Sequence, residues 1–232
     1  MSRELMTKAM AGRDPALAGI GLFPRAGGNV PFEIGWPEYE RDTAWARRLL
    51  DVWGVGPSQH AVLTVRNSES PWFGPVVRAM REIGVVYSNA EPYAWDSRRV
   101  GALLSLLPVE AIVGLPGETA ESLLADDGTA AKLADMPVIW ARRDALEPLR
   151  GAGLRPAEMA MLGPALGLSC PEGTGLHLDP EEWRVNAVSG RPTLTVAGDR
   201  RYRGRDIELD IDGVIDRAPC ACGLPGDRVR TR

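Results

Sequence analysis

Large apolar side chains between residues 36 and 53 recur at spacings of three and four, which is the pattern of an amphipathic helix. Proline at position 37 suits the first turn of such a helix, and glycine at position 54 suits its end. We therefore predict a helix that begins at Trp36 and ends at Gly54. Its three tryptophans, Trp36, Trp45 and Trp53, are expected to lie in the core.

Short apolar runs alternate with helical patterns over the next hundred residues. The predicted strands cover 60–66, 85–88, 111–115 and 137–141, and the predicted helices cover 71–84, 97–107 and 118–124. This alternation is typical of βαβ units, whose parallel strands are covered by helices on both faces. We expect an α/β fold with a mainly parallel sheet and flanking helices.

After Arg155 the sequence changes to short β-rich pieces. Between residues 205 and 217, three apolar residues alternate with acidic ones, and Asp212-Gly213 is a pair that a type I′ turn prefers. We predict an antiparallel hairpin with one solvated face at this place. The pattern divides the chain into a partly ordered lead-in (1–24), an α/β region (25–155) and a β-rich subregion of the same domain (156–232).

The composition is that of an ordinary globular protein, with 44% apolar and 25% charged residues in 232. A net charge of −4 argues against a basic face for nucleic acid. The sequence has neither a membrane-spanning apolar run of about 18 residues nor a signal peptide, so we expect no membrane partner and a cytoplasmic location.

All three cysteines and one of the two histidines fall into two short segments near the C-terminus. Cys170 and His177 bracket one loop, and Cys220 and Cys222 form a tight pair in another. Three thiolates and one imidazole complete a tetrahedral zinc site of the structural class. Two alternatives remain open: three buried thiols with a surface histidine, and Cys170 as a nucleophile with His177 as its base.

Four segments, taken in order, resemble the phenylacetate-CoA ligase branch of the adenylate-forming enzymes. The segments are RAGGNVPFEIGWPEYERDTAWARR (25–48), CPEGTGLHLDPEEW (170–183), RRYRGRDIELD (200–210) and PCACGLPGDRVR (219–230). These enzymes activate a carboxylic acid with ATP and transfer it to CoA. The resemblance implies part of their large N-terminal domain, with a β-rich end held by structural Zn²⁺ at the same Cys and His positions.

The departures from this family concern the nucleotide site. Gly27, Gly28 and Asn29 match the family's phosphate loop without its hydroxyls or lysine, and residues 162–166 lack the glutamate of the adenine motif. Asp206 matches the ribose-binding aspartate. Because the family's opening segment and the C-terminal domain with its lysine also have no counterpart, we expect a truncated, degenerate relative that does not use ATP and Mg²⁺.

The loops after two predicted strands are candidates for an acyl pocket, because parallel sheets bind ligands at the carboxyl ends of their strands. The candidates are Arg66, Asn67, Ser68, Glu69 and Trp72 after the first strand, and Tyr87, Asn89, Glu91 and Tyr93 after the next. Ordinary polar loops are the alternative.

The sequence thus leaves two function classes open. The first is a protein that binds an acyl or aromatic carboxylate-derived ligand, or a biosynthetic enzyme or carrier protein. The second is an enzyme repurposed for ATP-independent acyl transfer or cyclisation. A second copy that covers exposed sheet surface would make the protein a homodimer.

Overall fold

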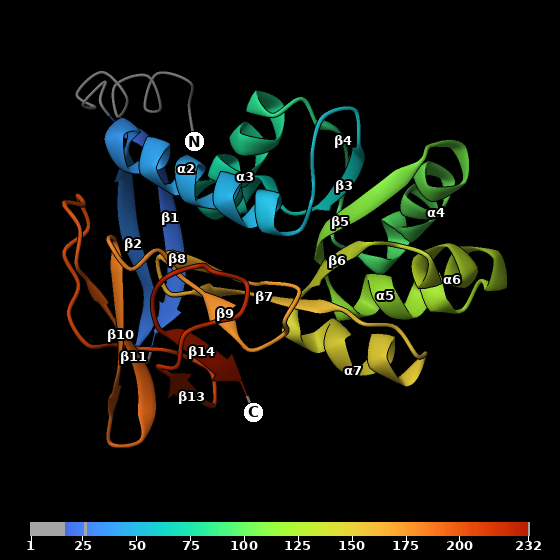
Figure 1. Cartoon of the computed structure of the whole chain (residues 1–232). Coiled ribbons are helices and arrows are strands. Elements are labelled where there is room, and N and C mark those ends of the chain that lie inside the picture. Colours follow the sequence, from blue (N-terminus) through green and yellow to red (C-terminus); the bar gives the residue numbers. More distant parts are fainter. Residues whose placement is uncertain (1–16, 26, 232) are drawn as a thin grey trace.

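A nine-stranded mixed sheet runs through the protein, whose computed structural model describes residues 17–25 and 27–231 (Figure 1). The strand order is β13-β14-β9-β8-β7-β6-β5-β3-β4. Neighbouring strands from β4 to β7 are parallel, and those from β7 to β13 are antiparallel. The strands are β3 (His60–Thr64), β4 (Val86–Ala90), β5 (Val109–Leu115), β6 (Val138–Ala141), β7 (Ala157–Leu162), β8 (Ala165–Ser169), β9 (Leu176–His177), β13 (Gly213–Asp216) and β14 (Arg228–Thr231).

Helices cover both faces of the parallel half of this sheet. The helices are α2 (Trp36–Val52), α3 (Ser70–Glu82), α4 (Ser97–Leu106), α5 (Gly117–Leu124), α6 (Asp127–Ala134) and α7 (Arg143–Gly151). In β3, Leu63 packs in one core cluster with α2 and α3, whereas Val62 packs in another with α4 to α7. This alternation follows from the two-residue period of a strand. The fold is therefore the expected α/β fold, and its parallel part consists of β4, β3, β5, β6 and β7.

Two smaller sheets flank the large one. β1 (Leu17–Arg25) and β2 (Gly28–Gly35) form an antiparallel hairpin. β10 (Trp183–Val188), β11 (Arg191–Val196) and β12 (Ile207–Glu208) form a three-stranded antiparallel sheet. The predicted lead-in is therefore wrong for residues 17–24, because Phe23 of β1 is buried against Phe32 of β2; residues 1–16 lie outside the described part of the chain.

The hairpin predicted between residues 205 and 217 does not form. β12 pairs with β11, and β13 pairs with β14, so the two segments belong to different sheets. Ile207 and Leu209 are buried as the alternation indicates, and both belong to the core cluster that contains Phe23 and Leu194.

The three tryptophans of α2 and its end differ in their surroundings. Trp45 is 6% exposed and lies in the core, and Trp53 is half-buried with its indole N–H donating to Ser169 O at 2.9 Å. Trp36 is 46% exposed, so its predicted core position is wrong. It is the first residue of α2 and lines a cavity that is described below.

Candidate functional site

The side chains of Cys170, His177, Cys220 and Cys222 converge on one point. Their ligand atoms all lie within 4.8 Å of one another. Cys170 Sγ lies 3.7 Å from Cys220 Sγ, and Cys222 Sγ lies 3.6 Å from His177 Nε2. A tetrahedral metal with metal–sulfur bonds of about 2.3 Å and a metal–nitrogen bond of about 2.1 Å gives edges of about 3.6–3.8 Å. The four residues therefore fit around a single metal ion.

Three parts of the chain carry these ligands to one place. Cys170 follows β8, His177 belongs to β9, and Cys220 and Cys222 lie in the loop between β13 and β14. Gly175, with φ of +130°, allows the chain to enter β9 close to β14, where an added Cβ would lie 2.9 Å from Val229 O. The sheet register thus brings ligands 50 residues apart in sequence into contact.

The protein environment acts differently on the four side chains of the cluster. Burial raises the pKa of Cys170 to about 12 and also raises the pKa of Cys222. Burial, and secondarily the charge of Arg228, lower the pKa of His177 to about 4, which keeps its imidazole neutral and able to ligate. Burial opposes ionisation of Cys220, but hydrogen bonds from Thr174 and from the backbone of Cys222 outweigh it and lower the pKa to about 7. His177 is fully buried, so the alternative of a surface histidine is wrong.

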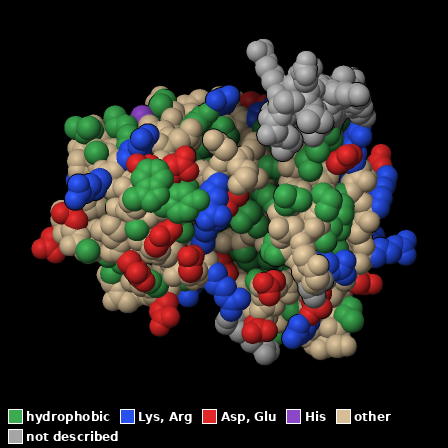
Figure 2. Space-filling model, turned by 180° about the vertical axis from the view of Figure 1, so that it is seen from behind, with side chains coloured by type: hydrophobic (Ala, Val, Ile, Leu, Met, Phe, Trp, Pro, Cys, Tyr) green, Lys and Arg blue, Asp and Glu red, His purple; other side chains and the backbone are tan. Residues whose placement is uncertain are grey.

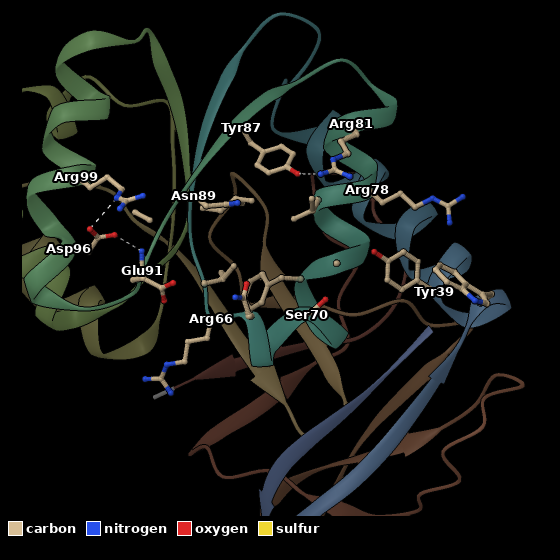
Figure 3. A pocket seen from close by; sticks show the side chains of 18 residues that line it. Tyr39, Arg66, Ser70, Arg78, Arg81, Tyr87, Asn89, Glu91, Asp96 and Arg99 are labelled. Atoms are coloured by element: carbon tan, nitrogen blue, oxygen red, sulfur yellow. Dashed lines mark hydrogen bonds and ion pairs between the residues drawn. The ribbon is translucent and has the colours of Figure 1, made fainter. Parts of the chain in front are cut away.

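A separate cavity of about 460 Å³ lies at the carboxyl ends of β3 and β4, between α2, α3 and the start of α4 (Figure 3). We call it the α3 pocket. On the face shown in Figure 2, basic side chains gather around a hollow in the middle of the molecule. The α3 pocket is lined by Trp36, Tyr39, Leu63, Val65, Arg66, Asn67, Ser70, Phe73, Gly74, Val77, Arg78, Arg81, Tyr87, Asn89, Ala90, Glu91, Asp96 and Arg99.

The structure brings five of the sequence-predicted residues into this lining. Arg66 and Asn67 come from the end of β3, and Tyr87, Asn89 and Glu91 come from β4 and its end. Of the lining residues that the sequence did not indicate, one group belongs to α3: Ser70, Phe73, Gly74, Val77, Arg78 and Arg81. Their spacings of three and four are the available signal, but that spacing predicts equally a face packed against a core.

Four predicted residues lie outside the lining of the α3 pocket. Ser68 is exposed. Trp72 is 6% exposed and packs on Phe32, with its indole N–H donating to Gly163 O at 2.9 Å. Tyr93 is half-buried beneath the Arg66 guanidinium, 5.1 Å from the ring centre.

The fourth, Glu69, is 6% exposed and forms a two-point ion pair with Arg142 at 2.7 and 2.8 Å. It also accepts a hydrogen bond from the backbone N–H of Arg66 at 2.9 Å. Burial alone would raise its pKa, but the hydrogen bonds and charge of Arg142 hold the pKa below its usual range. Glu69 therefore fixes the loop that carries Arg66 and does not face a ligand itself.

The electrostatics of the α3 pocket are uneven. Arg78 pairs with Glu82 at 2.9 Å, and Arg99 pairs with Asp96 at 3.2 Å. Arg81 has no carboxylate partner among the described residues; its guanidinium stacks 5.3 Å from the Tyr87 ring centre and donates to the Tyr87 hydroxyl. In Figure 3 these two side chains point toward each other beside Asn89. The pocket thus presents a positive charge with free donors next to an amide.

The residues that match the family's nucleotide motifs do not lie in the α3 pocket. Gly27 and Gly28 lie at the exposed tip of the β1–β2 hairpin, and Asn29 pairs with Pro24. The hairpin puts these glycines seven residues or more before Gly35, the N-cap of α2, so they do not form a loop at a helix start. Asp206 is exposed with φ of +46°, and its backbone N–H donates to Thr195 Oγ1.

The sequence matches no protein-family model and no curated protein at a significant level. The structure resembles 2-hydroxyisobutyryl-CoA ligase in the postadenylation state with a TM-score of 0.69, 12% identity, and coverage of 100% of this chain and 56% of that chain. It resembles MatB from Rhodopseudomonas palustris with a TM-score of 0.61, 12% identity, and coverage of 85% and 45%. It resembles E. coli MenE with a TM-score of 0.55, 12% identity, and coverage of 94% of this chain and 45% of that chain.

These likenesses show that the chain has the fold of part of the adenylate-forming acyl-CoA ligases. It spans about half the length of the ligases that it matches. Within the described residues, no helix combines the length and apolar character needed to cross a bilayer.

Proposed function

We propose that this protein binds a small carboxylate or carboxylate-derived acyl ligand in the α3 pocket without adenylating it. The observation that carries the proposal is the Arg81 guanidinium, which has no carboxylate partner among the described residues and lies next to Asn89 in a cavity of ligand size. An arginine and an amide are donors that recognise a carboxylate or a thioester carbonyl.

The other walls of the pocket suit the apolar part of such a ligand. Phe73 and Val77 of α3, Leu63 of β3 and Val65 just after β3 contribute apolar side chains to the lining. Tyr39 lies over Gly74, where an added Cβ would be 2.7 Å from the phenol oxygen. This close approach leaves an aromatic ring at the wall, which favours an aryl or short acyl group.

The proposed absence of adenylation rests on the residues that match the nucleotide motifs. The matching segment of β2 offers Gly28 and Asn29 in a strand ladder instead of a cradle of backbone amides. Leu162 and Leu166, at the place of the adenine motif, are apolar and offer no carboxylate to Mg²⁺.

We also propose that the four-residue cluster holds Zn²⁺ in a structural role. Three thiolates and one imidazole are the donors that zinc prefers among divalent ions, and they leave no position open for a substrate. The metal would hold the loop before β14 against β8 and β9.

Titration calorimetry with benzoate, phenylacetate and their CoA thioesters tests the ligand proposal. We expect at least one of them to bind, and Arg81→Gln to weaken its binding about 10- to 100-fold, because a hydrogen bond to a charged group contributes about 1.5–3 kcal/mol. Arg150→Gln is the matched control, since this exposed arginine on α7 is remote from the pocket lining and should leave affinity unchanged.

Binding by none of these compounds, or equal affinity in the Arg81→Gln variant, would contradict the ligand site. Incubation with ATP, Mg²⁺ and an aryl acid should release no pyrophosphate, and robust release would reject the absence of adenylation. Product formed from a thioester without ATP would support the alternative of an ATP-independent enzyme.

A further inference from the structure

Three neighbouring strands place Asp216, Arg228 and His177 side by side. Asp216 of β13 lies opposite Arg228 of β14, and Arg228 lies opposite His177 of β9. Residues directly opposite one another in a sheet project to the same face. A carboxylate, a guanidinium and a metal-ligating imidazole therefore form one row across the sheet.

Arg228 is unusual because only part of its side chain is used. The side chain is 2% exposed, and its Nη2 lies 2.8 Å from Asp216 Oδ2. Its Nε and Nη1 are buried and have no hydrogen-bond partner among the described residues. Burial of unpaired guanidinium donors is costly, so a sequence that keeps an arginine here needs another favourable interaction for it.

The cysteine cluster provides that interaction. Arg228 lies opposite His177 in the β9–β14 ladder, and its positive charge interacts with His177, Cys170 and Cys220. A divalent ion with three thiolates and a neutral imidazole has a net charge of −1. A net charge in a buried place is unfavourable unless an opposite charge compensates it.

We propose that Arg228 is a positioning residue that neutralises the buried metal centre and thereby stabilises its three thiolates. This inference rests on the metal site of the proposed function. It assigns the residue to the metal instead of to strand pairing alone, since Asp216 occupies only one of its three nitrogens.

Two variants separate a charge effect from a structural one. Arg228→Gln and Asp216→Asn both break the same ion pair, but only the first removes the positive charge. Zinc affinity is measured on the full chain by competition with a chromogenic chelator. We expect Arg228→Gln to bind zinc about 10- to 100-fold more weakly, as is usual when a residue that supports a metal ligand is lost, and Asp216→Asn to bind it at least as tightly as the parent protein. Arg228→Lys should bind it more tightly than Arg228→Gln.

A second readout uses the thiolates themselves. All three cysteines of the chain belong to the cluster, so alkylation of the zinc-loaded protein by iodoacetamide reports on this centre alone. Zinc already holds the three sulfurs as thiolates, so loss of the positive charge does not change their protonation. It makes the thiolates more basic and therefore more nucleophilic, and Arg228→Gln should be alkylated faster than the parent. Asp216→Asn should be alkylated more slowly.

Equal zinc affinity of Arg228→Gln and the parent protein would overturn the inference, as would equal weakening in Arg228→Gln and Asp216→Asn. If Arg228→Gln does not fold, the test uses Asp216→Asn alone. Alkylation of Asp216→Asn at the rate of the parent protein or faster would then contradict the proposed role of Arg228. Absence of zinc from the parent protein itself would instead refute the metal site of the proposed function.

Discussion

At the residue scale, Glu69 shows how a polar side chain near the α3 pocket serves structure. Its carboxylate binds Arg142 from the segment after β6 and the backbone N–H of Arg66 after β3, so it joins two loops at the carboxyl ends of strands that lie on either side of β5. The position of Arg66 at the pocket wall thus depends on a residue that does not touch the cavity.

The ion pair leads to a prediction about pH. Because the folded-state pKa of Glu69 lies below its usual value, the pair stabilises the protein above pH of about 4.5, and this contribution is lost as the pH falls through the lower folded-state pKa. Glu69→Gln should lower the free energy of unfolding by about 2–4 kcal/mol at pH 7, and the difference should shrink as the pH falls below about 4.

Urea unfolding of both proteins over this pH range checks the prediction. Glu147→Gln removes an exposed carboxylate of α7 and should leave the stability at pH 7 unchanged. A difference between parent and Glu69→Gln that does not depend on pH would show that the carboxylate acts through its shape and not through its charge.

At the element scale, an irregularity in β5 connects the sheet to this ion pair. The β5–β6 register shifts between Val113 and Leu115, and Gly114 between them has φ of +98°. This conformation directs Gly114 O toward Arg142 Nε, which donates to it at 3.0 Å. The bulge in one strand therefore orients the arginine that holds Glu69.

Substitution of this glycine tests the role of the bulge. In Gly114→Ala the added Cβ would lie 2.8 Å from Thr64 O at a positive φ, so we expect a loss of about 2–3 kcal/mol in the free energy of unfolding. Gly151→Ala is the matched control, because this last residue of α7 has nothing within 4 Å of the added Cβ. It should be neutral or stabilising by up to about 1 kcal/mol, and an equal loss in both variants would refute the bulge argument.

At the scale of the whole molecule, the cluster of Cys170, His177, Cys220 and Cys222 lies where three segments of the chain meet. β9 has two residues, and the loop that carries Cys220 and Cys222 has no helix or strand of its own. Without a metal, the side chains that meet between these segments would be three thiols and an imidazole, with no metal bonds to hold the segments together. Metal binding and folding of the antiparallel half should therefore be coupled.

The two histidines of the chain provide a matched test of this coupling. His177→Gln should abolish zinc binding, measured by elemental analysis, and should lower the melting temperature by at least about 10 °C. Chelation of the parent protein should give a similar loss. His60→Gln should retain one zinc per chain, because His60 lies on β3 with Ser88 Oγ at 3.5 Å from its Nε2. Unchanged metal content in His177→Gln would remove this residue from the ligand set.

The parallel half of the fold could be predicted because its signals are local. The predicted helix from Trp36 and the strand at 111–115 agree with α2 and β5 to within a few residues at each end. The period of apolar residues is set by backbone geometry and needs no knowledge of distant partners. The grouping of the three cysteines with His177 could be predicted for a similar reason, because cysteine and histidine are few in this chain and chemically distinct.

Strand partners and pocket walls depended on contacts between distant residues. The alternation around Ile207 predicts buried strand residues, but pairing with β11 instead of with β13 is decided by which edges the rest of the chain leaves open. Similarly, Arg81 and Phe73 follow a helical period that predicts one face of α3, whereas the packing of α2 and β4 determines that this face borders a cavity. The sequence alone determined the local elements and the donor atoms of the Cys/His cluster, since these are properties of single residues and of short segments. Only the tertiary structure decided the sheet order, the fixed loop at Glu69 and the pocket around Arg81, because these arise where segments far apart in the chain meet.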